Sequence, residues 1–80
     1  MFENIEQLKN WEFYRISTSI NNKIFLEFQN KNSIYGKIKI KHSVIKNKGV
    51  SIYNNTTLYD IFQFNNVREI NKYIIEDKEL

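Results

Sequence analysis

Three lysines stand two residues apart in the stretch "YGKIKIKHS", and two isoleucines separate them. On a β-strand successive side chains point to opposite faces, so Lys37, Lys39 and Lys41 would share one face while Ile38 and Ile40 share the other. We call the three lysines the lysine ladder. A row of ammonium groups on an uncovered sheet face suits a negatively charged partner, either the phosphates of single-stranded nucleic acid or the carboxylates of a protein.

Aromatic residues are predicted to lie beside the lysine ladder. Tyr35 falls on the same face of the same strand, and neighbouring strands can bring Phe25 and Tyr53 close to it. Aromatic rings interleaved with lysines are typical of sheets that stack nucleic-acid bases. The same alternation of lysine and isoleucine is also typical of a half-buried strand whose lysines discourage edge-to-edge aggregation. The residues predicted to bind a partner are Tyr35, Lys37, Lys39, Lys41, Phe25 and Tyr53.

The sequence offers little for catalysis. His42 is the only histidine, and the strand alternation predicts it on the isoleucine face as a structural side chain. Ser43 would then point to the opposite face, so the two cannot form a nucleophile and base pair. A zinc site needs three or four donors, and no glycine-rich phosphate loop occurs. We therefore predict a protein that is not an enzyme and that has no metal and no cofactor.

Length and composition limit the remaining choices. Eighty residues make a single domain, 1–80, and the absence of cysteine fits a reducing compartment. No signal peptide or membrane-spanning run is recognisable, so the prediction is a cytoplasmic protein with no membrane partner. Asparagine, lysine, isoleucine, tyrosine and phenylalanine dominate, which indicates an AT-rich genome. The segment 31–50 contains six lysines and no acid, so it supplies more than the whole net charge of +3.

Helical spacing of apolar residues predicts a short helix over residues 2–9. Aromatic and β-branched runs then predict strands at 11–19, 23–29, 34–45 and 50–54, joined by short turns rich in asparagine. Such short connections imply antiparallel neighbours. After Thr57, which with Asp60 resembles a helix capping box, residues 58–64 are predicted as a helix, with a fifth strand as the alternative. A second helix is predicted from Asn66 to Ile74.

These elements predict an α+β fold. It consists of a four-stranded antiparallel β-meander with a short N-terminal helix and one or two C-terminal helices packed on one face. The lysine ladder would then lie on the uncovered face.

Two functions from different classes fit this prediction. The first is a small protein-binding protein, an inhibitor or adaptor of the phage or mobile-element type that acts on a host nucleic-acid-handling enzyme or defence nuclease. The second is a direct single-stranded RNA- or DNA-binding module that uses the lysine and tyrosine face. A monomer and a homodimer joined through sheet edges are both compatible with the sequence.

Overall fold

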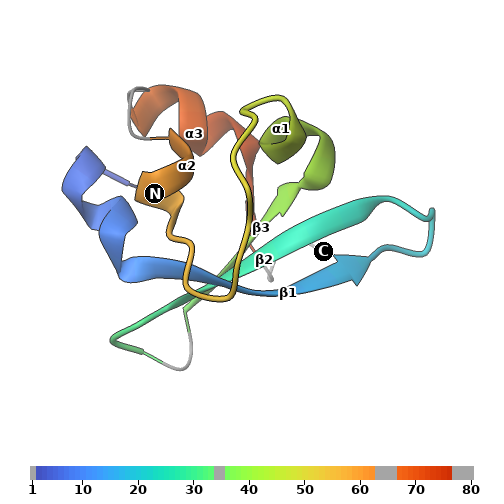
Figure 1. Ribbon diagram of the computed structural model, residues 1–80, viewed down its shortest axis with the longest axis horizontal. Coiled ribbons are helices and arrows are strands. Elements are labelled where there is room, and N and C mark those ends of the chain that lie inside the picture. The colour runs from blue at the N-terminus through green and yellow to red at the C-terminus, as the bar shows by residue number, and fades with distance from the viewer. Residues whose placement is uncertain (1, 34–35, 63–66, 77–80) are drawn as a thin grey trace.

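The computed structural model describes residues 2–33, 36–62 and 67–76. A 3-10 helix opens the chain, three long strands follow, and short helices and a last short strand complete it (Figure 1). The elements are η1 Ile5–Asn10, β1 Trp11–Thr18, β2 Ile24–Asn30, β3 Lys37–Lys41, α1 His42–Lys46, α2 Leu58–Phe62, α3 Val67–Tyr73 and β4 Ile74–Glu76.

The architecture is α+β, as predicted, and its centre is a three-stranded antiparallel meander in the order β1-β2-β3. The predicted four-stranded meander is wrong in its last strand. Residues 50–54 form no strand, and the fourth strand of the sheet is β4, which pairs antiparallel with the outer edge of β3. A helix was predicted to continue through Ile74. The two consecutive β-branched residues Ile74 and Ile75 instead pair with β3, whose edge would otherwise be open.

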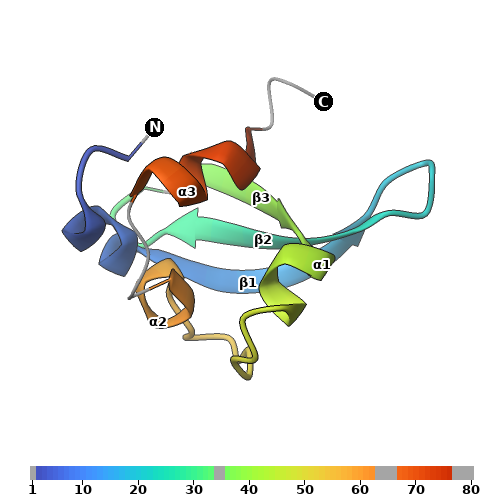
Figure 2. The ribbon, with the colours of Figure 1, turned by 90° about the horizontal axis from the view of Figure 1, so that it is seen from above.

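The helices of the described residues lie together on one side of the sheet (Figure 2). The core fills the space between them and the sheet, and its strand residues alternate along each strand. Phe13 from β1, Leu26 and Phe28 from β2, and Ile38 and Ile40 from β3 all belong to it. The prediction that Ile38 and Ile40 are buried is therefore confirmed, and the lysine ladder lies on the opposite face.

Local side-chain bonds explain where two of the helices begin. At η1 the Asn4 side chain accepts a hydrogen bond from the Gln7 amide, while the Gln7 side chain accepts one from the Asn4 amide. The same reciprocal pair occurs before α2. The Thr57 hydroxyl accepts from the Asp60 amide at 3.2 Å, and the Asp60 carboxylate accepts from the Thr57 amide at 2.9 Å. The predicted helix at 58–64 is thus confirmed for Leu58–Phe62, and the remaining two residues lie outside the described ones.

The predicted strand 34–45 is shorter than expected. The strand covers Lys37–Lys41, and the chain then turns into α1. Val44 is half-buried and Ile45 is buried against the same core. Adjacent residues of a strand point to opposite faces, whereas one helical turn can bury both. His42 begins this helix and is exposed, so the prediction of a satisfied or half-buried structural histidine on the isoleucine face of a strand is wrong.

Trp11 packs closely against the backbone of Gly36. Its ring meets Phe2 edge-on at 5.9 Å between centroids, and it lies against Gly36. A Cβ atom at Gly36 would come within 2.9 Å of the Trp11 ring and within 3.1 Å of the Asn30 Cβ. The missing side chain of Gly36 therefore makes room for the tryptophan.

Replacing Gly36 by alanine should destabilise the protein by about 1 to 3 kcal/mol, because the Trp11 ring is held by Phe2 and cannot move away freely. Urea denaturation followed by circular dichroism would measure this loss. The same substitution in a Trp11→Leu background should cost much less. An equal loss in both backgrounds would show that the contact with Trp11 is not the cause.

Candidate partner-binding face

The side of the sheet that faces away from the helices carries a concentrated set of polar and charged side chains. We call this surface the basic sheet face. It is defined by seven residues on the side of β1, β2 and β3 opposite the core, namely Tyr14, Arg15, Phe25, Glu27, Lys37, Lys39 and Lys41. Glu12 and Gln29, which pair with each other, lie at its border on the same side of the sheet. Strand pairing places the lysine ladder beside β2, with Lys41 opposite Phe25, Lys39 opposite Glu27 and Lys37 opposite Gln29.

A β-bulge sets which residues of β1 reach the basic sheet face. The register shifts between Phe13 and Arg15, so Tyr14 is an extra residue that has no partner in β2. Without the shift, Arg15 would point into the core and Ile16 away from it. With it, Tyr14 and Arg15 both reach the basic sheet face, while Ile16 lies on the helix side opposite Leu26.

Glu27 is the centre of this face. It is only 2% exposed, although no helix of the described residues covers this side of the sheet. The Tyr14 hydroxyl donates a hydrogen bond to Oε1 of Glu27 at 2.9 Å, and Nε of Arg15 donates to Oε2 at 2.9 Å as part of an ion pair. A buried carboxylate needs such partners to remain charged. Glu27 therefore joins β1 and β2 through a fixed ionic contact.

Burial and hydrogen bonding act on Glu27 in opposite directions. Burial alone would raise the pKa of its carboxyl, but the hydrogen bonds and the charge of Arg15 outweigh burial, and the pKa lies below its ordinary value. The Tyr14 hydroxyl acts in the same direction. The Ser17 hydroxyl also lies nearby. It forms no hydrogen bond with any described residue, so it is a neighbour of Glu27 and not a bonded partner.

This lowered pKa predicts an acid-sensitive contribution to stability. A carboxyl whose pKa is lower in the folded state stabilises the fold fully above its ordinary value of 4.5, and the contribution disappears as pH falls through the folded-state pKa. Glu27→Gln should therefore lose less stability than wild type as the pH falls from 7 to about 3. Urea denaturation across this range would measure the two slopes. Parallel slopes would contradict the ionic role of Glu27.

Tyr14 extends the cluster across all three strands. Its ring lies 5.9 Å from the Arg15 guanidinium carbon and 5.7 Å from the Lys37 ammonium nitrogen. Both distances are within the range of cation–π attraction. The ring starts on β1, its hydroxyl reaches Glu27 on β2, and Lys37 comes from β3. The ring of Tyr14 thus contacts two cations of the basic sheet face, Arg15 and Lys37.

The predicted site residues have different positions. Lys37 and Lys41 are exposed and Lys39 is half-buried, all on the basic sheet face. Phe25 lies on this face too, but it is only 6% exposed and offers almost no ring surface. Its pairing partner Lys41 can cover it with the aliphatic part of its side chain. Tyr35 lies outside the described residues.

Tyr53 was predicted close to Tyr35 on a neighbouring strand, but no such strand forms at residues 50–54. It is 67% exposed in the connection between α1 and α2. Its amide donates to the Thr56 hydroxyl at 2.9 Å, which closes a turn where a strand was expected. Thr57, which follows this turn, forms a β-bridge with Glu12 on the outer side of β1. This places the segment beside β1, at the opposite end of the meander from the lysine ladder on β3.

Tyr14, Arg15 and Glu27 are the members of this face that the sequence prediction missed. Glu27 carried a detectable signal, because it stands two residues after Phe25 on a predicted strand and so shares its face. The position of Arg15 carried none, because simple alternation along β1 would have placed it with the core. Only the bulge brings it to Glu27.

The arrangement can bind charge. Its buried acid, Glu27, is ion-paired, and the other residues that define the face are cations and aromatic rings. In the described part of the chain, histidine, aspartate and glutamate side chains form no group of three or more that could hold a metal ion. No helix there combines the length and the apolar composition needed to span a bilayer.

Comparison with protein-family models, with curated protein sequences and with solved structures finds no match to this chain.

Proposed function

We propose that the protein is a small non-enzymatic binding protein whose basic sheet face docks on an acidic surface of a partner protein. The observation that carries the proposal is the cluster around Glu27. Its ionic and cation–π contacts restrict the positions of Arg15 and Lys37 before any partner arrives. Cations that are already ordered lose less entropy on binding, so they are better suited to a specific partner than free surface lysines.

The geometry favours a row of carboxylates over single-stranded nucleic acid. Stacking of bases requires open ring faces, and Phe25 is buried. Tyr14 is only partly accessible, since its hydroxyl is bonded to Glu27 and two cations lie near its ring. Alternate residues on a strand are about 6.5 to 7 Å apart, a spacing that suits both carboxylates on a protein surface and phosphates of an extended strand, so the preference for protein rests on the covered rings.

The positive charge of the basic sheet face also indicates which kind of inhibitor or adaptor the protein would be. Nucleic acid is negative, and a basic face cannot imitate it. The basic sheet face therefore fits an inhibitor or adaptor that covers an acidic region of its target, including the carboxylates of a nuclease, better than one that occupies a positively charged nucleic-acid channel.

Affinity capture from a nuclease-treated lysate of the native host, followed by mass spectrometry, tests this function. We expect a protein that is retained by the wild type and lost from a variant with Lys37 and Lys41 changed to glutamate. In parallel, fluorescence anisotropy with labelled oligothymidine measures direct nucleic-acid binding. Tight oligonucleotide binding that weakens with salt by about 0.7 log units per phosphate contact would overturn the proposal in favour of the nucleic-acid-binding module.

A further inference from the structure

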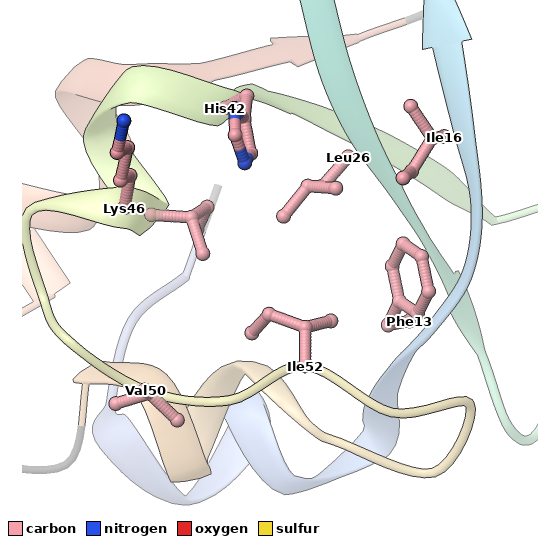
Figure 3. Close-up of a pocket in the computed structure, with 8 residues that line it drawn as sticks. Phe13, Ile16, Leu26, His42, Lys46, Val50 and Ile52 are labelled. Carbon is pink, nitrogen blue, oxygen red and sulfur yellow. The ribbon is translucent and has the colours of Figure 1, made fainter.

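A second surface feature lies on the helix side of the sheet, away from the basic sheet face. The β1–β2 hairpin extends beyond the helices, as Figure 1 shows, and leaves an apolar groove between β1, α1 and the connection that follows α1. The groove has a volume of about 370 Å³ (Figure 3). Its apolar lining is formed by Phe13, Ile16, Leu26, Ile45, Val50 and Ile52.

Two apolar side chains in and beside the groove are exposed to solvent. Ile16 is 60% exposed, and Ile24, two residues before Leu26, the pairing partner of Ile16, is 47% exposed. Phe13, Leu26 and Ile45 beneath them are buried. Exposed isoleucines beside a lined groove mark a surface that gains free energy when it is covered.

The basic side chains that line the groove lie together on one of its walls. His42 and Lys46, at the two ends of α1, line the wall opposite Ile16 (Figure 3). No acidic residue lines the groove, and Lys46 forms no ion pair within the described residues. A segment that enters the groove with a carboxylate would therefore meet an ammonium group and an imidazole on this wall.

The backbone beside the groove is also open to a partner. β1 is an edge strand in the sheet order. On its outer side the Phe13 amide donates to the Thr56 carbonyl and Glu12 bridges Thr57, and beyond these no strand of the described residues pairs with it. An uncovered edge strand can accept an added strand from another protein, whose alternate side chains then enter adjacent pockets.

We propose that this groove binds an extended segment of a partner protein that adds to the edge of β1, places alternate apolar side chains in the groove and directs one aspartate or glutamate toward Lys46. This is a second docking site, independent of the basic sheet face. A second copy of this chain fits less well, because its most exposed apolar segment, the turn with Ile20, carries Lys23 and no acid.

Selection of a random peptide library displayed on phage, with the folded wild-type protein as the target, tests the proposal. Enriched peptides should alternate apolar residues and contain an acid. Synthetic versions should bind Ile16→Asp about tenfold or more weakly, the effect of losing a central anchor. Lys46→Glu should remove the preference for an acidic over an amide-substituted peptide. Lys37→Glu should leave peptide binding unchanged, which keeps this test separate from that of the basic sheet face.

Three results would overturn the proposal. They are a selection without enrichment, enriched peptides that lack an acid, and a wild-type dimer in sedimentation that Ile16→Asp dissociates, since the last would make a second copy the occupant. Circular dichroism confirms that each variant is folded. Lys46 is exposed, so Lys46→Glu remains informative if Ile16→Asp fails to fold.

Discussion

Shortening Ile40 to alanine should remove much of the stability of this protein. Ile40 is fully buried near the C-terminal end of β3, where it pairs with Leu26 of β2 and Ile74 of β4. Deleting such a side chain leaves a cavity and costs about 2 to 5 kcal/mol. A domain of this length has a free energy of unfolding of about 4 to 12 kcal/mol, so the loss could leave a large unfolded fraction at ambient temperature.

Ile24→Ala is the matched control, because it deletes the same atoms from a neighbouring strand. Ile24 is 47% exposed, and its loss should cost less than about 1 kcal/mol. Urea denaturation of both variants would measure the difference. If the two substitutions cost the same, Ile40 would not be the centre of the core.

Reversing the charges of Lys37 and Lys41 should weaken the binding of an acidic protein partner by about a hundredfold or more, as expected when two close charge pairs become repulsive. The melting temperature should change little, because both side chains are exposed. Lys39 is left unchanged in this variant. It is half-buried opposite Glu27, and a second carboxylate there would destabilise the fold by repulsion. Isothermal titration calorimetry with the captured partner would measure the affinity.

A variant with Lys23 and Lys72 changed to glutamate has the same net charge and serves as the control. Both lysines are exposed and lie outside the basic sheet face, one in the β1–β2 turn and the other on α3. This variant should retain its affinity apart from a modest effect on the association rate. An equal loss in both variants would show that the partner responds to total charge and not to the basic sheet face.

The sequence predicted those parts of the fold that depend on near neighbours. Alternation over Lys37–Lys41 correctly separated buried isoleucines from lysines, because side-chain direction on a strand has a period of two residues. The capping pair Thr57 and Asp60 correctly marked the start of α2, because its hydrogen bonds span only three residues.

The parts that failed depend on distant segments. Residues 50–54 contain β-branched and aromatic side chains, but they form no strand, and the chain pairs with the edge of β1 only later, at Thr56 and Thr57. Ile74 continues the helical apolar spacing of the residues before it, yet Ile74–Glu76 pairs with the edge of β3 as a strand. Likewise, the bulge that brings Arg15 to Glu27 requires β1 and β2 together. Which segments pair with a given strand edge depends on several distant segments at once, so it cannot be predicted from the sequence of one segment.

The contact between Phe2 and Asn71 has a consequence for how the molecule forms. The Asn71 side chain accepts a hydrogen bond from the Phe2 amide at 3.1 Å and donates one to the Phe2 carbonyl at 3.0 Å, across 69 residues of chain. A contact that closes so long a loop forms late, because its entropic cost falls once the intervening strands are in place. During synthesis, residue 2 therefore waits without this partner until α3 has left the ribosome. The meander can assemble from its local hairpins as it emerges, and the contact between Phe2 and Asn71 forms last.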